Sequence, residues 1–368
     1  MSKIPIVKST VKPEEKKEII LTPLEKFKLV YATKCKEASI QMYKPLLKTL
    51  DRDEENLEKT ERIFIQDDKF GIKGLSCLLT ALKEYPSINE FAFYQIGSGD
   101  EGIQLICNFI IENPRSNFSL EIFDNITIMG CRQLSRLFLT KGPHILQTII
   151  LDHNPIGDAG SLALAEGAKD YQNLRHLSLK YCGIGTVGGL ALVTLLLANT
   201  SKCKIESLNL QGNEIGSRPL SMLGLALPQC NTLKEIGIAD IGVSEDDQEA
   251  LDCFCDGVAQ NRSLEKINID LNNIDTKTAP QISSDVFKRI LDALMDNRTK
   301  AYLNPTEEEE EKEEEEDWEY EEEGDKEAEE GETKKEEALK ATSQKKKLID
   351  EHALSHSVSK KISQPKKQ

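Results

Sequence analysis

The sequence predicts an α/β solenoid, an open stack of strand–helix units. The first observation is a repeat with apolar residues at positions 1, 4 and 6, Asn or a substitute at 9, an apolar residue at 11, and Gly at 12 and 15. The second is its spacing, because copies begin at residues 60, 88, 117, 146, 174, 205, 233 and 264, which are 28 to 31 residues apart. A unit of this length cannot bury its own apolar face, so neighbouring units must stack.

Each part of the unit has a structural interpretation. Positions 1–6 predict a short strand that turns positions 4 and 6 to one side. At position 9 the chain turns, and an Asn side chain there can satisfy backbone groups that the turn leaves unpaired. The two glycines begin a helix that packs close to the strand. We expect local irregularity where Ile96 and Ile241 replace Asn and where residues 128–131 replace the glycine pair.

The motif L-x-x-L-x-L-x-x-N/C-x-I-G-x-x-G, clearest from Leu146 to Gly160, resembles the ribonuclease-inhibitor class of leucine-rich repeats. The resemblance covers roughly residues 60–300. It implies a horseshoe with a parallel sheet on the concave face and helices on the convex face.

The ends of the solenoid require caps, because a stack otherwise exposes its core. Residues 1–59 are expected to form a loose N-terminus followed by a helical cap, with helices over 24–32 and 37–50 and Pro45 as an interruption. Residues 60–303 form the repeat domain, and its last helix, over 280–303, is the C-terminal cap. Residues 304–368 are an acidic and then basic tail, either disordered or one extended helix.

Most of the net charge of −16 resides in this tail. Residues 306–340 hold 21 acidic and 5 basic residues, whereas residues 341–368 hold 7 Lys and 2 acidic residues. The tail serves either as a solubilising segment or as an interaction arm. No basic stripe marks the body, so a nucleic-acid partner has no electrostatic support.

The remaining composition excludes further classes. The longest apolar run, around residues 190–198, is about half of the ~20 residues that span a bilayer, so no membrane span is expected. The N-terminus lacks the pattern of a secretory signal. Nine cysteines at irregular spacing predict reduced thiols, as in the cytosol.

Catalytic patterns are weak, and we expect neither an enzyme nor a cofactor or metal. No phosphate-binding glycine motif occurs, and no nucleophile stands at a recognisable spacing from a histidine. One alternative is a similarity to Ran GTPase-activating proteins, whose mechanism involves an Arg and an Asn in repeat loops. The corresponding candidates are Arg132 and Asn154, although their loops lie in consecutive repeats.

A stronger candidate site lies on the predicted concave face. Equivalent positions of successive repeats stack about 4.8 Å apart, so columns of side chains can be read directly. Positions 5, 7 and 8 of the first five repeats gather aromatic and apolar residues, with acidic residues around them. The predicted partner-binding residues are Phe64, Tyr94, Phe123, Ile150, Asp152, His153 and Tyr181.

Two interpretations of this cluster remain open. Aromatic anchors beside Asp67, Glu121, Asp124 and Asp152 suit a protein partner of basic character. Alternatively, the N-terminal helices of residues 24–50 fold back over the cluster and make it core.

The N-terminal segment adds a second resemblance. Residues 31–35 (YATKC) and 45–50 (PLLKTL) are similar to the stretch preceding the first repeat in ciliary leucine-rich-repeat proteins such as those of the nexin–dynein regulatory complex. The resemblance implies a non-enzymatic adaptor in the cytoplasm, on the cytoskeleton of a ciliary axoneme. Its partners would be axonemal coiled-coil or dynein-associated proteins. A third possibility is a soluble inhibitor-like binding module, which would use the same kind of surface and differ only in its partner.

Overall fold

The computed structural model describes residues 21–56, 59–115, 117–197, 201–244, 246–269, 272 and 288–295. The chain divides into two units, residues 1–300 and 301–368, and the fold described here is that of the first. The expectations for residues 1–20 and for the tail, 304–368, lie outside the described residues.

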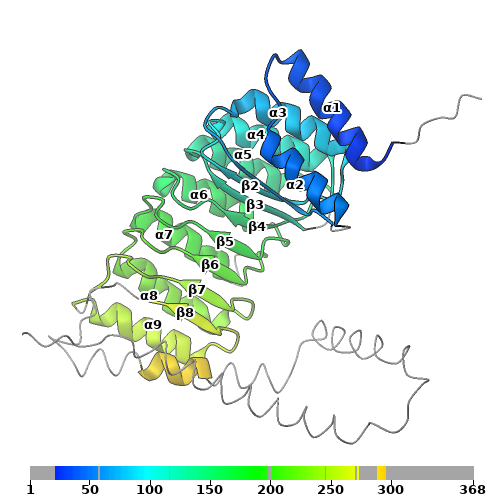
Figure 1. Ribbon diagram of the computed structural model, residues 1–368. Helices are drawn as coiled ribbons and strands as arrows, with labels where there is room; N and C mark the ends of the chain where they lie inside the picture. Colours follow the sequence, from blue (N-terminus) through cyan, green and yellow to red (C-terminus); the bar gives the residue numbers. More distant parts are fainter. Residues whose placement is uncertain are drawn as a thin grey trace, which may run out of the picture. The chain divides into compact units, whose positions relative to one another are not determined.

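Eight parallel strands form one open sheet in which every strand pairs with its neighbours in sequence (Figure 1). One strand occurs in each of the eight predicted repeats. The α/β solenoid with a parallel sheet is therefore confirmed. The strands are β1 (Arg62–Gln66), β2 (Glu90–Tyr94), β3 (Phe118–Phe123), β4 (Leu146–Ile150), β5 (His176–Ser178), β6 (Ser207–Asn209), β7 (Glu235–Gly237) and β8 (Lys266–Asn268).

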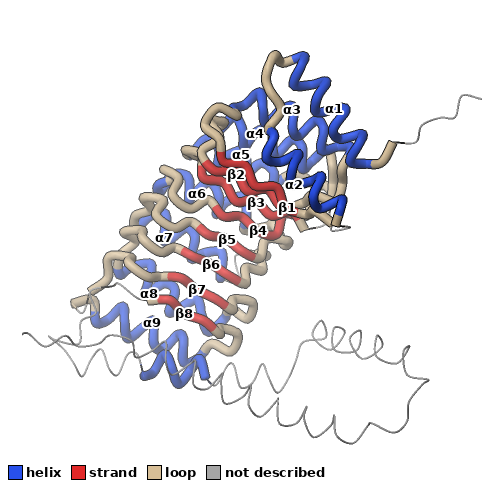
Figure 2. Tube along the Cα trace, in the orientation of Figure 1, coloured by secondary structure: helices blue, strands red, loops and turns tan. Residues whose placement is uncertain are grey.

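A helix follows each of the first seven strands, and these helices form a layer on one side of the sheet (Figure 2). They begin near the glycine positions of the repeat, as expected. They are α3 (Gly71–Ala81), α4 (Gly99–Glu112), α5 (Ile128–Leu139), α6 (Gly157–Ala168), α7 (Thr186–Val193), α8 (Ser217–Ala226) and α9 (Gln248–Gln260), with short 3₁₀ turns at Leu82–Glu84, Thr194–Leu196 and Leu227–Gln229.

The strand register matches the columns read from the sequence. Phe64 pairs with Ala92, Ala92 with Glu121, and Glu121 with Ile150. Positions 4 and 6 point toward the helices and are buried, as Ile63 and Ile65 are in β1. Positions 3, 5 and 7 point the other way, and we call the surface that they form the sheet face.

Asparagine side chains at position 9 link consecutive turns, as predicted. The Asn213 Oδ1 accepts hydrogen bonds from the backbone N–H groups of Cys182 (2.9 Å) and Ile184 (3.1 Å). Its Nδ2 donates to the carbonyls of Leu179 (2.7 Å) and Leu210 (2.8 Å). Asn154 and Asn272 make equivalent contacts in their own repeats.

The N-terminal cap differs in its boundaries from the prediction. Helix α1 (Pro23–Glu37) begins with a capping box in which Thr22 and Glu25 bind each other's backbone N–H groups. Helix α2 (Lys44–Glu55) carries Pro45 in its first turn. The proline therefore begins the helix instead of interrupting one, because the N–H that proline lacks has no partner in the first turn.

At the other end, residues 288–295 are helical, and the rest of the predicted C-terminal cap helix lies outside the described residues. Ile290 and Leu294 are buried against the core, whereas Leu291 is 60% exposed. Arg289 binds the carboxylates of Asp252 and Asp256 on α9. These contacts attach the helical segment to the helix of the seventh repeat.

Candidate protein-binding surface

Five rings on the sheet face touch one another in sequence from the first repeat to the fifth. We call Phe64, Tyr94, Phe123, His153 and Tyr181 the aromatic row. Successive ring centroids lie 5.3, 6.5, 5.7 and 4.9 Å apart, and His153 stacks on Tyr181 at an interplanar angle of 10°. Such pairs are within the distance at which rings stabilise each other. The structure thus brings together the aromatic residues that the sequence singles out.

Backbone conformation places the last two rings of the row. His153 (φ 60°) and Tyr181 (φ 53°) adopt the left-handed conformation, which bulky residues adopt rarely. The equivalent residue of the next repeat is Gly212 (φ 71°), and a Cβ there would lie 2.2 Å from the Tyr181 ring. The row therefore ends at Tyr181, where glycine leaves room for its ring.

The aromatic row is open to solvent at both ends. Phe64 is 52% exposed and Tyr181 is 42% exposed, while Tyr94 and Phe123 are half-buried. The expectation that the N-terminal helices cover the cluster is wrong. Their apolar side chains pack instead on the first repeat, where Phe27 meets Tyr85 and Tyr43 meets Phe70.

A pocket opens beside the middle of the row. Its volume is about 240 Å³. We call it the sheet-face pocket. It is lined by Tyr94, Glu121, Ile122, Phe123, Ile150, Asp152 and His153.

Glu121 lies on one side of this pocket and holds two side chains in place. One carboxylate oxygen accepts a hydrogen bond from the Tyr94 hydroxyl, and the other accepts one from Arg62 at 2.6 Å. Partial burial, and then the hydrogen bond to Glu121, raise the pKa of Tyr94 to about 12. The tyrosine therefore remains a neutral hydrogen-bond donor at physiological pH.

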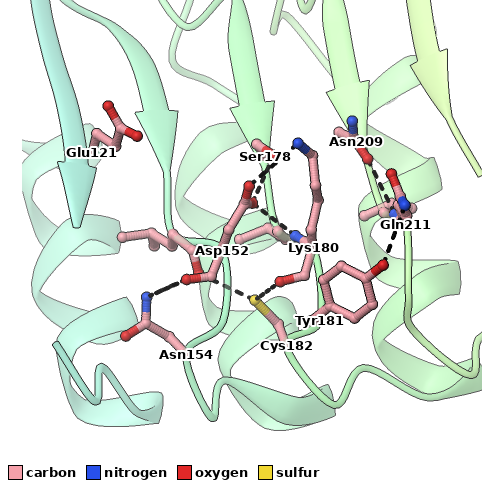
Figure 3. Close-up of polar contacts among 12 residues, drawn as sticks. Glu121, Asp152, Asn154, Ser178, Lys180, Tyr181, Cys182, Asn209 and Gln211 are labelled. Carbon is pink, nitrogen blue, oxygen red and sulfur yellow. Dashed lines mark hydrogen bonds and ion pairs between the residues drawn. The ribbon is translucent and has the colours of Figure 1, made fainter. Parts of the chain in front are cut away.

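Asp152 lies on the other side of the pocket (Figure 3). Its Oδ1 accepts hydrogen bonds from the Ser178 hydroxyl (2.7 Å) and the Lys180 backbone N–H (2.8 Å). Its Oδ2 lies 3.5 Å from the Lys180 ammonium. These contacts orient the carboxylate and join the fourth repeat to the fifth.

Asp124 does not belong to the acidic rim that the sequence predicts. It is 2% exposed, and its carboxylate accepts hydrogen bonds from the backbone N–H groups of Gly97, Ser98 and Gly99 at the start of α4. Asn125 (φ 57°), the next residue, takes the left-handed conformation, and the Asp124 side chain turns inward. This is the local irregularity expected near residues 128–131.

Comparison with known proteins agrees with the repeat pattern. A family model described as leucine rich repeat matches residues 172–193 and 201–224. Mouse ribonuclease inhibitor is 26% identical over 216 residues, which is 56% of this chain and 45% of that protein. The pig ribonuclease inhibitor is 27% identical over 200 residues, or 53% of this chain and 42% of that protein.

The chain carries leucine-rich repeats, and it is similar to the ribonuclease inhibitors. Human NACHT, LRR and PYD domains-containing protein 3 is also similar, at 30% identity over 138 residues, 36% of this chain and 13% of that protein. The matched region spans less than half the length of each of these relatives. Repeats of this type suggest a role in binding proteins.

The two residues of the GTPase-activating alternative have separate surroundings in the repeats. Arg132 is exposed on α5, with its guanidinium 3.7 Å from the sulfur of Met129. Asn154 is 1% exposed, and its amide binds backbone groups of Asp124, Ile126 and Ile122. The side chain of Asn154 is therefore occupied in linking turns.

No described helix has the length and apolarity needed to cross a membrane. Among the same residues, no group of three or more His, Cys, Asp or Glu side chains is arranged to hold a metal ion.

Sequence reasoning missed the cations that neutralise the two pocket carboxylates. Arg62 occupies position 3 of the first repeat, a column that the reading of positions 5, 7 and 8 leaves out. Lys180 does appear in the position 7 column, directly beside Asp152. Comparing charged residues between repeats would have paired Lys180 with Asp152 in the same column, and Arg62 with Glu121 two columns apart.

Proposed function

We propose that this chain is a non-enzymatic protein-binding scaffold whose partner lies across the aromatic row. The observation that carries the proposal is a row of five touching rings on the sheet face, exposed at both ends and half-buried at Tyr94 and Phe123. Interface hot spots are enriched in aromatic residues, and a side chain held by its neighbours loses little entropy when it binds. The name of the ribonuclease inhibitors describes proteins that act on another protein, which is in keeping with this role.

The experiment replaces Tyr94 and Phe123 together with Ala. A photo-crosslinking amino acid at Tyr181 reports the partner in cells. We expect a discrete crosslinked product that the double substitution abolishes, while the thermal unfolding midpoint changes little. The matched control replaces Leu139 and Leu225, which are both 61% exposed on helices α5 and α8, and it should leave the crosslink intact. An unchanged crosslink in the Tyr94/Phe123 variant, or a large loss of stability, contradicts the proposal.

For the cellular setting we propose a ciliary axoneme, with axonemal coiled-coil or dynein-associated proteins as partners. The support is the similarity of residues 31–35 and 45–50 to ciliary leucine-rich-repeat proteins. In this structure Tyr31, Cys35, Leu46 and Leu50 are buried in the N-terminal cap. The similarity therefore concerns residues that form the interior of this cap.

Fractionation of ciliated cells tests this setting. A built-in adaptor should remain with the detergent-resistant axoneme through a high-salt wash. Release into the detergent-soluble fraction contradicts the axonemal assignment. GTP hydrolysis by Ran, measured with the wild-type chain and with Arg132→Ala, should then show no stimulation by either protein if the role is non-enzymatic.

A further inference from the structure

Glu121 and Asp152 line the sheet-face pocket, whereas Arg62 and Lys180, the cations that pair with them, do not. Glu121 and Asp152 contribute two carboxylates from adjacent repeats, and none of the seven lining residues is Lys or Arg. Acidic groups that face a pocket without a cation favour a positively charged occupant.

The cations that bind these carboxylates approach from outside the pocket. Arg62 extends from β1 to Glu121 on β3, passing the small side chain of Ala92 on β2. Lys180 follows β5 and meets Asp152, which follows β4. Neither Arg62 nor Lys180 lines the pocket itself. Figure 3 shows Lys180 on the side of Asp152 away from Glu121.

The walls of the pocket suit a planar cation. Tyr94, Phe123 and His153 line it, and Phe123 lies between the other two rings, 6.5 Å from Tyr94 and 5.7 Å from His153. A guanidinium group stacks on aromatic faces and donates hydrogen bonds in its own plane. An ionised carboxylate has about four lone-pair sites, so Glu121 and Asp152 can each accept a further donor beside the ones they already hold.

We infer that the sheet-face pocket receives an arginine side chain of the protein partner, stacked against the rings that line it and bound by Glu121 and Asp152. This inference rests on the proposed function, since it names the chemistry of the partner at the same surface. Phe64 and Tyr181, at the ends of the row, then contact apolar residues that flank the arginine. The partner is a segment with one arginine set among apolar side chains.

The test uses the full chain and a small probe, N-acetyl-arginine methylamide. Binding is followed by NMR through the methyl groups of Ile150, which lines the pocket. We expect saturable shifts with the arginine probe and clearly weaker ones with the matching lysine and leucine probes. If the lysine or leucine probe gives equal or larger shifts, the inference is wrong, and this result needs only the wild-type protein.

Glu121→Gln is the matched variant, because the amide retains the shape of the side chain and still accepts from Tyr94. Losing one charged acceptor should weaken arginine binding by about fivefold. Glu235→Gln removes the same charge from position 3 of β7, where Glu235 pairs with Lys266 outside the pocket, and should change nothing. Unaltered binding to Glu121→Gln overturns the inference.

The two proposals fail in different ways. If the arginine probe does not bind but the Tyr94/Phe123 substitution still abolishes the crosslink, the scaffold stands and the arginine assignment falls. If that substitution leaves the crosslink intact, the binding surface itself is wrong, whatever the probe does.

Discussion

The first three repeats and the later ones follow the same pattern with different side chains, and each repeat up to the seventh has a strand, a turn and a helix. In the first three, Phe91 contacts Phe93, Phe109 and Phe118, each at a centroid distance of 5.9 Å. In the last five, the core consists mainly of leucine and isoleucine, and asparagines such as Asn213 link the turns. The strands also shorten, from five or six residues in β1–β4 to three in β5–β8.

The comparison shows that the repeat specifies the backbone more tightly than it specifies the stabilising side chain. A unit requires apolar volume at positions 4 and 6 and partners for the backbone groups of the turn. In the first repeats, phenylalanines fill the apolar positions and Asp124 binds the backbone of a turn. In the later repeats, aliphatic residues fill these positions, and Asn154, Asn213 and Asn272, which we call the asparagine ladder, bind the turns. The aromatic row belongs to the sheet face, which the repeat leaves free to vary.

The largest expected effect tests the aromatic core of the first repeats. Phe91→Ala should lower the free energy of unfolding by about 4 kcal/mol, because Phe91 is 1% exposed and its removal leaves a cavity among three other rings. Urea unfolding followed by circular dichroism measures the change. Phe64→Ala is the control, since this ring of β1 lies on the sheet face and its loss should cost less than about 1 kcal/mol. Equal losses would contradict the distinction between core and sheet face.

The asparagine ladder of the later repeats should respond somewhat less. Asn213→Ala leaves two N–H groups and three carbonyls of consecutive turns without their side-chain partner, at a cost of about 3 kcal/mol. The same unfolding measurement applies. Glu214→Ala changes an exposed neighbour and should be close to neutral. If Asn213→Ala cost no more than Glu214→Ala, the ladder would not be what holds these turns.

The smallest expected effect concerns a single proton on the sheet face. Because the pKa of Tyr94 is raised from 10.0 to about 12, its contribution to stability is complete below pH 10 and is lost as the pH rises toward 12. Glu121→Gln should lower the pKa of Tyr94 but leave it above 10, since burial is the larger cause and persists. The tyrosinate absorbance at alkaline pH, compared between the two proteins, measures this shift. An identical titration would show that Tyr94 and Glu121 do not interact in solution.

The sequence by itself determined the unit and its number. Eight copies at near-equal spacing, with apolar residues at alternating positions, predicted eight parallel strands and the pairing of Phe64, Ala92, Glu121 and Ile150. This was possible because a solenoid repeats its contacts, so each column of the alignment is a column in space. The identity of the row residues followed from the same columns.

Only the tertiary structure decided which segments pack near the sheet face and which cations pair with its carboxylates. The cap helices pack on the first repeat and leave Phe64 exposed, a choice that depends on contacts between segments far apart in sequence. The turn of the third repeat buries Asp124 against the start of α4, and Arg62 reaches Glu121 across an intervening strand. Side-chain reach and turn conformation act between repeats, so the pattern within one repeat does not contain them.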